Sequence, residues 1–272
     1  MPPGIDGKGR GKNVEEQKHT RVNNILLGPL ERPALQWLAA HMPAWVTPDH
    51  LTELGLAASV LIFASYWLTS LSPAYLWLAS LGFLLNWFGD SLDGTLARHR
   101  KIERPLYGFF VDHAIDALST VLIFIGLGLS PYVRFEFAML ALVGYLLMSV
   151  YTYLVTYANG VFRISYAGLG PTEVRALAIL INTVVFFLGN REVRISLPVP
   201  GPFSIFDLAI LFLAIVFFVG FIVVSVTTAL ELEKKDTEKL LRRQQAQREK
   251  EARKAARQKE KKQRSLAGQT HK

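Results

Sequence analysis

GDSLDGTLARHRKIERPLYGFFVDHAIDAL, residues 89–118, lies between two strongly apolar segments of the chain. From Asp90 to Asp116 it holds four aspartates and two glycines, with a run of basic residues in the middle. A charged side chain at the centre of a bilayer costs about 2.5–3.5 kcal/mol, so four unpaired acids would cost on the order of 10 kcal/mol. Such acids persist only beside positive charge or water. We therefore predict a metal site at the boundary between membrane and water.

The rest of the chain predicts an all-α, polytopic membrane protein. Of its 272 residues, 51% are hydrophobic, and long apolar runs alternate with short polar stretches. The absence of cysteine excludes disulfides and thiolate metal sites. A span of 24 residues extends about 36 Å, enough to cross a hydrocarbon core of about 30 Å. We expect six transmembrane helices, near residues 51–70, 74–97, 105–128, 135–158, 173–189 and 204–230.

The two ends of the chain differ from these spans. Residues 19–46 mix apolar and charged side chains and contain Pro29 and Pro33, which predicts a kinked interfacial amphipathic helix. Thr47 or Asp49 can cap the helix that follows. The expected parts are therefore a disordered N-terminus (1–18), the interfacial helix (19–46), a six-helix transmembrane catalytic domain (47–230) and a basic cytoplasmic tail forming a charged helix (231–272).

The net charge of +8 comes from one end of the chain. Residues 231–272 hold 15 Lys and Arg against 7 Asp and Glu, and residues 1–230 are balanced. Nucleic-acid binding is therefore not expected, whereas a tail lying on anionic lipid headgroups is. The connections at 98–104 and 159–173 are also basic, and the positive-inside rule then puts both termini and the aspartates on the cytoplasmic side of an integral membrane protein.

The aspartates follow helical spacing. Asp90 and Asp93 are three residues apart, so a helix places both on one face. Asp112 and Asp116, four apart, share a face of the next helix in the same way. Two neighbouring antiparallel helices can therefore bring four carboxylates together. Small residues on these faces leave room for a helix or a flat ligand: Gly94, Ala97 and Gly108.

Four carboxylates in one cluster predict hard divalent cations. Carboxylate oxygens suit Mg²⁺, Mn²⁺ or Ca²⁺ rather than zinc. The number of acids suggests two ions, Mg²⁺ or Mn²⁺, which could clamp a pyrophosphate. Three alternatives remain at this point: a transporter that uses the aspartate cluster as an ion or substrate site, a polyprenyl-transferring enzyme, and a scaffold that recruits partners through its tail.

The motif Asp90-x2-Asp93-Gly94-x2-Ala97-Arg98-x9-Gly108-x3-Asp112-x3-Asp116 resembles the signature of the CDP-alcohol phosphotransferase (phosphatidyltransferase) family, and all eight positions are filled. The expected interfacial helix and six spans, with the signature on the second and third, agree with that family. The resemblance implies metal-dependent transfer of a substituted phosphate group from a CDP-linked donor to an alcohol acceptor, with release of CMP, in phospholipid biosynthesis. It is also compatible with a homodimer.

The resemblance also implies residue roles. It assigns metal binding to four acids: Asp90, Asp93, Asp112 and Asp116. Asp116 is in addition the expected general base. It assigns contacts with the CDP donor to six residues: Asp49, Thr52, Gly94, Ala97, Arg98 and Gly108. The auxiliary candidates are His113, Arg163 and Arg175. The histidine could assist proton transfer or only hydrogen-bond a loop, and the arginines could hold a phosphate or only fix the topology.

Two short segments bear on the donor. Asp112-His113-x2-Asp116 resembles the DHxxD form of the choline/ethanolamine phosphotransferase branch, and ThrGluValArg at 172–175 is similar to a segment of the same branch. That branch uses a CDP-amino alcohol and a diacylglycerol-like acceptor. The DHxxD form resembles other members as well, so the donor stays open between CDP-diacylglycerol and a CDP-amino alcohol.

Overall fold

The computed structural model describes residues 20–22, 26–159, 161–163, 170–189, 192–193 and 203–269, and this part of the chain is almost entirely helical. Its helices are α1 (Gly28–His41), α2 (Pro48–Leu68), α3 (Tyr75–Arg100), α4 (Pro105–Gly128), α5 (Phe135–Asn159), α6 (Pro171–Leu188) and α7 (Ile205–Gln269). Two short strand pairs accompany them: β1 (Thr20–Val22) parallel to β2 (Val161–Arg163), and β3 (Glu192–Val193) antiparallel to β4 (Phe203–Ser204). The N-terminus predicted to be disordered, 1–18, lies outside the described residues.

The helices agree closely with the predicted spans, and the chain is a polytopic helical membrane protein. Five described helices are long and apolar enough to cross a membrane: α2, α4, α5, α6 and α7. The helix predicted as the second crossing, α3, has 26 residues but falls outside this group. Polar side chains from Asn86 onward, including Asp90 and Asp93, lower its hydropathy.

Local sequence signals explain where α2 begins and how it packs. Thr47 is its N-cap, and its hydroxyl accepts the His50 N–H, as the sequence predicts. A Cβ at Gly89 of α3 would lie 2.5 Å from the Leu51 carbonyl oxygen, so only glycine lets the two backbones approach this closely. At Gly126 of α4, a Cβ would lie 2.7 Å from a backbone atom of α2. Both acid-bearing helices therefore rest on α2.

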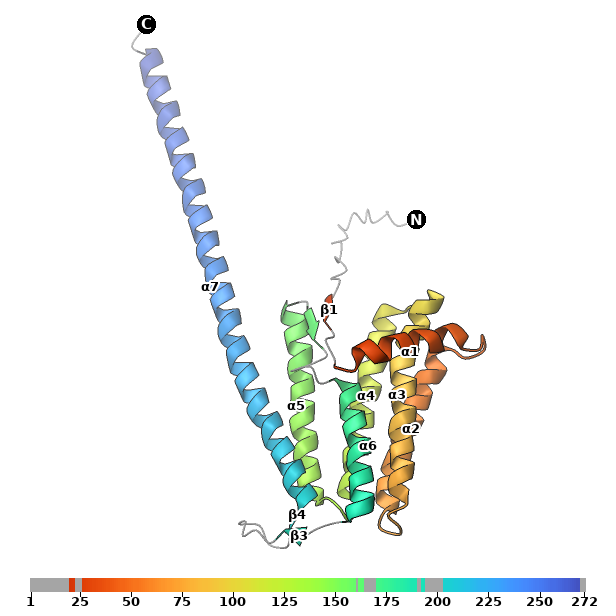
Figure 1. The fold of residues 1–272 in the computed structure, drawn as a ribbon. Helices are drawn as coiled ribbons and strands as arrows, with labels where there is room; N and C mark the ends of the chain where they lie inside the picture. Colours follow the sequence, from red (N-terminus) through yellow and green to blue (C-terminus); the bar gives the residue numbers. More distant parts are fainter. Residues whose placement is uncertain are drawn as a thin grey trace, which may run out of the picture. The chain divides into compact units, whose positions relative to one another are not determined.

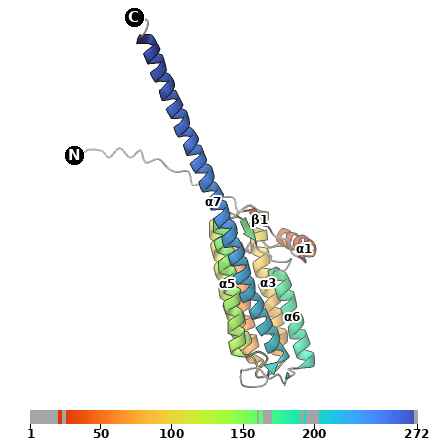
Figure 2. The same cartoon turned by 90° about the vertical axis from the view of Figure 1, so that its left-hand side faces the viewer.

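The packing of α3 and α4 differs from the sequence prediction that these two helices are direct antiparallel neighbours. α2 packs extensively against both α3 and α4, α6 packs against α3, and α5 against α4, whereas α3 and α4 make hardly any direct contact. The axes of α3, α5 and α6 lie roughly parallel to one another in both views (Figure 1, Figure 2). The acid-bearing helices are thus held by a common support, and space remains between them.

Buried polar side chains link the helices. Asn86 of α3 donates its amide N–H to Ser59 Oγ of α2 at 3.0 Å. Tyr66 of α2 donates to Asn182 Oδ1 of α6 at 2.9 Å, and Asn182 donates to Ser80 Oγ of α3 at 3.2 Å. Hydrogen bonds of this kind are favoured inside apolar bundles because an unpaired polar group there is costly. They fix the positions of α2, α3 and α6 around the site.

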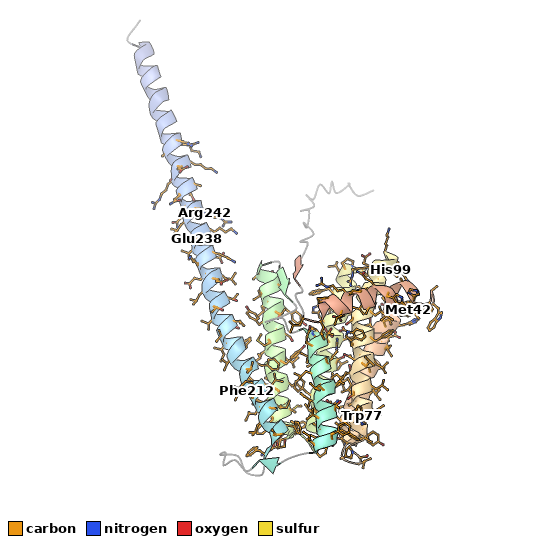
Figure 3. The ribbon with its side chains drawn as sticks, viewed as in Figure 1. Met42, Trp77, His99, Phe212, Glu238 and Arg242 are labelled. Carbon is orange, nitrogen blue, oxygen red and sulfur yellow. The ribbon has the colours of Figure 1, made fainter. Side chains whose placement is uncertain are left out.

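The predicted amphipathic helix is present as α1, but it spans Gly28–His41 rather than 19–46, and Thr20–Val22 form β1 instead. Helix α1 runs across the ends of the bundle helices (Figure 1). It buries Leu35 and Ala39 against Leu92 and Leu96 of α3, while Trp37 is 62% exposed. This division into a buried and an exposed apolar face suits a helix at a membrane surface. Met42 and His99 are at this end of the bundle, and Trp77 is at the opposite end (Figure 3).

Two buried glutamates attach α1 to the bundle. Glu31 Oε1 accepts hydrogen bonds from Trp87 Nε1 of α3 and from Thr172 Oγ1 of α6, both at 2.8 Å. Glu173 of α6 accepts the Leu27 N–H at 2.8 Å, just before α1 begins. The position of α1 is therefore coupled to α6, the helix that carries Arg175.

The outward faces of the bundle remain apolar. Large exposed side chains occur on α4, α5 and α6: Leu106, Phe110, Leu154, Leu180 and Phe187. Apolar patches on this scale, on helices of membrane-spanning length, are what lipid would cover. The chain divides into two units after Phe221, and the second, starting at Ile222, continues α7 as the charged helix predicted from the sequence.

Candidate metal centre

Three of the four predicted metal ligands converge. Asp90 of α3 and Asp112 and Asp116 of α4 each offer a carboxylate oxygen, and these three oxygens lie within 4.8 Å of one another. The spacing of four residues on α4 puts its two acids on one face, as the sequence predicts. The two helices meet across the space that α2 leaves between them. A set of oxygens this close, from two helices, can surround one cation.

Asp93 lies one helical turn beyond Asp90 and lines the same pocket. Its Oδ2 accepts a hydrogen bond from Thr52 Oγ1 at 2.7 Å, and its Oδ1 accepts the Gly94 N–H at 2.5 Å. These two bonds orient the carboxylate, in the way that outer partners orient metal ligands. Thr52, predicted to contact the nucleotide, therefore acts in this structure on a predicted metal ligand.

Arg175 brings positive charge to the cluster from α6. Its Nη2 donates to Asp90 Oδ2 at 2.7 Å, and its side chain is only 13% exposed. A buried guanidinium beside buried carboxylates offsets part of their mutual repulsion. The four aspartates still outnumber it, which leaves an excess of negative charge in the pocket.

The pocket between these helices is narrow. It is lined by Thr52, Gly55, Asn86, Asp90, Asp93, Asp112, Ile115, Asp116 and Ser119. The Ser119 hydroxyl oxygen is buried and has no hydrogen-bond partner among the described residues. Ser119 was not predicted from the sequence. It lies three residues after Asp116 and therefore on the same face of α4.

The other residues predicted to contact the nucleotide lie on α2, α3 and α4 and are not among the residues that line this pocket. Nothing lies within 4 Å of a Cβ built at Gly108, so this face of α4 is open. The atoms nearest to a Cβ at Gly94 belong to the flexible end of Arg98, the closest at 3.2 Å. Ala97 lies on α3 next to Arg98, whose guanidinium donates to Thr95 Oγ1 at 3.1 Å.

Asp49 is placed apart from the carboxylate cluster. It forms an ion pair with Arg104, and both side chains are about half exposed. Arg104 also stacks over the Tyr107 ring, with its Cζ 4.2 Å from the ring centroid. The short segment between α3 and α4 is therefore tied to the first turn of α2.

The auxiliary candidates differ in what the structure gives them. His113 Nδ1 lies 2.7 Å from the Phe109 carbonyl oxygen and 3.8 Å from Asp112 Oδ2. Its ring packs on Phe109 and edge-on to Tyr153. Arg163 ends β2, and its side chain lies outside the described part of the structure.

The residues present fit a hard divalent cation. The donors are carboxylate oxygens, the oxygens of three of them are close enough to share an ion, and negative charge is in excess. Imidazole and thiolate donors, which suit zinc, are absent from this group of three. The chemistry of the donor set thus suits a hard divalent cation such as Mg²⁺, Mn²⁺ or Ca²⁺.

Comparison with known proteins agrees with this geometry. Residues 45–231 match the family model of CDP-alcohol phosphatidyltransferase. The matched segment begins just before α2, includes all eight signature positions and extends into α7. It covers more than half of the chain.

Individual relatives are named enzymes of lipid synthesis. Cholinephosphotransferase 1 of Danio rerio is 29% identical over 188 residues, which is 65% of this chain and 48% of that protein. The Homo sapiens protein of the same name is 27% identical over 186 residues, 65% of this chain and 45% of its own length. Archaetidylinositol phosphate synthase of Pyrococcus horikoshii is 32% identical over 130 residues, which is 47% of this chain and 61% of that protein. The chain spans about half the length of the cholinephosphotransferases it matches.

Proposed function

The chain belongs to the CDP-alcohol phosphatidyltransferase family, and from this premise we propose that it transfers a substituted phosphate group from a CDP-linked donor to an alcohol hydroxyl and releases CMP. One observation carries the proposal: three signature carboxylates from α3 and α4 converge to within 4.8 Å inside a membrane-type helical bundle. Convergence of acids from two helices is what a site for metal-bound diphosphate requires. The product would be a phosphodiester lipid.

We propose that Asp90, Asp93, Asp112 and Asp116 hold two divalent cations, Mg²⁺ or Mn²⁺. When bound, such ions neutralise the negative charge that develops on a pyrophosphate as its P–O bond breaks. The protein's part is to fix the carboxylates. Thr52 and the Gly94 N–H orient Asp93, and the packing of α3 and α4 on α2 sets the distance between the two pairs of acids.

Asp116 is the proposed proton acceptor. The oxygen of the acceptor hydroxyl attacks the phosphorus atom that bears the donor's alcohol group. The bond from this phosphorus to the CMP oxygen breaks, CMP leaves with the bonding electrons, and the hydroxyl proton goes to an Asp116 carboxylate oxygen. A carboxylate is a weak base for an alcohol, so correct positioning of the two substrates must supply most of the acceleration.

The nucleotide part of the donor is proposed to lie over the open faces of α3 and α4. The space beside Gly108 and the small side chain of Ala97 admit a flat base or a ribose, and the atoms nearest to Gly94 belong to the flexible end of the Arg98 side chain. Arg98 is the proposed phosphate or ribose contact, and Asp49, beside Arg104, is a proposed contact at the rim. His113, Arg163 and Arg175 stay auxiliary candidates.

We propose a CDP-amino alcohol as the donor and a diacylglycerol-like alcohol as the acceptor. The DHxxD form of Asp112 to Asp116 and the relatives named cholinephosphotransferase support this choice. CDP-diacylglycerol with a polar alcohol is the competing pair, supported by the relative named archaetidylinositol phosphate synthase. The two pairs differ in which substrate carries the lipid, so they are separable by assay.

The proposed orientation puts both termini and the aspartates on the cytoplasmic side. The basic connection at 98–104 and the basic tail support it. The chain has no cysteine, so a single Thr237→Cys substitution in the tail gives an unambiguous labelling site. A membrane-impermeant thiol reagent should label it in inside-out vesicles and not in right-side-out ones. Mass determination in nanodiscs tests the proposed homodimer separately.

The activity is tested with the purified protein in nanodiscs. Each donor and acceptor pair is supplied with Mg²⁺, Mn²⁺ or EDTA, and CMP release and lipid product are measured. We expect CMP release only with a divalent cation, and more product from the CDP-amino alcohol pair. Asp112→Asn should abolish turnover because it removes an anionic ligand from the cluster.

Glu136→Gln is the matched control, because Glu136 is an exposed carboxylate paired with Arg134 at the other end of the bundle. It should keep wild-type turnover. Full activity of Asp112→Asn would refute the assignment of the site. Movement of a solute across sealed vesicles without any CMP release would instead favour a transporter.

A further inference from the structure

Arg175 is the basic residue that α6 places against the aspartate cluster. Its guanidinium is bonded to Asp90 Oδ2 at 2.7 Å, and both side chains are largely buried, at 13% and 22% exposure. Asp90 is at the same time one of the three acids whose oxygens converge. The guanidinium therefore holds one of the two oxygens of a carboxylate that a cation in this cluster would use.

The hydrogen bonding of Arg175 is incomplete. Its Nη1 atom is buried and has no partner, and Ser119 Oγ is the one other buried side-chain N or O atom without a partner among the described residues. Ser119 lines the aspartate pocket, and Arg175 contacts an aspartate of that pocket. Unpaired buried polar atoms are rare in proteins and cost free energy. Both of them here lie at one site, so this site has hydrogen-bonding capacity that the described residues do not use.

We propose that Arg175 is an internal counter-ion that competes with a divalent cation for Asp90. In the ion-free protein the guanidinium offsets the repulsion among the aspartates and keeps α3, α4 and α6 together. When a cation binds, Asp90 exchanges the guanidinium for the ion, and the side chain of Arg175 withdraws. The inference rests on the metal site of the proposed function and adds a residue that sets its affinity.

Electrostatics gives the sign of the effect. A guanidinium in contact with Asp90 repels an incoming dication and must be displaced from an oxygen, so it weakens cation binding. Because Nη1 has no partner among the described residues, moving the guanidinium away breaks only the observed hydrogen bond from Nη2 to Asp90. Removing the charge of Arg175 should therefore tighten cation binding while making the ion-free protein less stable.

The test measures Mn²⁺ binding rather than turnover. Free Mn²⁺ is quantified by electron paramagnetic resonance in titrations of the full-length protein in nanodiscs, for wild type, Arg175→Gln and Arg175→Met. Both variants keep much of the side-chain volume and lose the charge. We expect Kd for Mn²⁺ to fall by about tenfold or more, within the range that outer partners of metal sites usually command.

Arg134→Gln is the control, because Arg134 also pairs with a carboxylate but at the opposite end of the bundle, 3.5 Å from Glu136. It should leave Kd unchanged. An unchanged or higher Kd in both Arg175 variants would overturn the proposal, because it would make Arg175 a structural residue or a supporting one for the ion.

Thermal unfolding is a second measurement, and it can also be interpreted for variants that are unstable without the ion. Saturating Mn²⁺ should raise Tm more in Arg175→Gln than in wild type, since the ion replaces a charge that the variant lacks. A variant that folds only with Mn²⁺ would support the proposal, and one that Mn²⁺ does not rescue would contradict it. If binding follows this pattern but no CMP is released, the counter-ion role stands and the proposed reaction falls.

Discussion

The Thr52 hydroxyl on α2 donates a hydrogen bond of 2.7 Å to Asp93 Oδ2 on α3. This bond joins the helix that supports the site to one of its acids, across 41 residues of sequence. Thr52 Oγ1 also lies 3.1 Å from the Pro48 carbonyl oxygen, so its rotamer is fixed by the first turn of α2. The orientation of Asp93 thus depends on a residue that lies outside the eight-position signature.

Thr52→Val should lower activity with little effect on the fold, because it replaces the hydroxyl by a methyl group of similar size. Asp93 would lose one of its two orienting bonds. Loss of such a partner typically costs about 10–100-fold in metal affinity or activity. The measurement is CMP release as a function of Mg²⁺ concentration, and the midpoint should move to higher Mg²⁺. Thr52→Ser should stay close to wild type, and equal activity of both variants would remove the role assigned to Thr52.

Gly89→Ala should destabilise the bundle. The added methyl group would lie 2.5 Å from the Leu51 carbonyl oxygen and 2.7 Å from the Gly55 nitrogen, and neither backbone atom can move away easily. Overpacking of this kind costs about 1–3 kcal/mol. The expected result is a lower Tm in detergent.

Gly108→Ala is the paired experiment, since nothing lies within 4 Å of the added Cβ. Its Tm should equal or exceed that of the wild type, because alanine favours helix. Its KM for the CDP donor should rise, because the methyl group enters the space proposed for the nucleotide. An unchanged KM would place the nucleotide elsewhere.

Glu31→Ala should loosen α1. The substitution leaves the Trp87 indole N–H and the Thr172 hydroxyl without their shared acceptor. Each buried donor left unpaired costs about 1–3 kcal/mol. We expect a lower Tm and a change in tryptophan fluorescence, while Glu53→Ala, at an exposed position of α2, should change neither. A wild-type Tm would indicate that α1 is held by apolar contacts alone.

Asp49→Ala should separate a surface contact from a substrate contact. The pair that Asp49 makes with Arg104 is about half exposed, and such pairs contribute about 0–1 kcal/mol. Stability should therefore change little. If Asp49 contacts the nucleotide as proposed, KM for the CDP donor should rise, whereas Arg104→Gln should alter it less.

Much of this arrangement could be predicted from the sequence because helices have a fixed periodicity. Asp112 and Asp116 had to share a face, and the apolar runs had to form long helices. Thr47 was one of two expected caps for the helix after α1, and the structure confirms it as the N-cap of α2. The mixed apolar and charged residues before them similarly predicted α1.

The contacts between helices could not be predicted in the same way. Periodicity fixes a face within one helix but not the rotation of one helix against another. The sequence therefore did not predict that α2, rather than direct packing, holds α3 and α4, or that Arg175 would reach Asp90. The family resemblance predicted that Thr52 contacts the nucleotide. Its hydrogen bond to Asp93 became apparent only in the three-dimensional structure. The spacing of Ser119 from Asp116 would have placed it on the acid-bearing face of α4, but an uncharged serine does not by itself indicate a site.

The glycine contacts of α2 have a further consequence for ion choice. Gly89 sets how near α3 lies to α2, and Gly126 sets how near α4 lies. The separation of the two pairs of carboxylates therefore depends on two glycines that are not themselves metal ligands. Mg²⁺ demands near-octahedral geometry and short ligand distances, whereas Ca²⁺ accepts more ligands at longer distances. Exchanging glycine for alanine on the faces of α3 and α4 that contact α2 should therefore change the selectivity between such ions without altering any ligand.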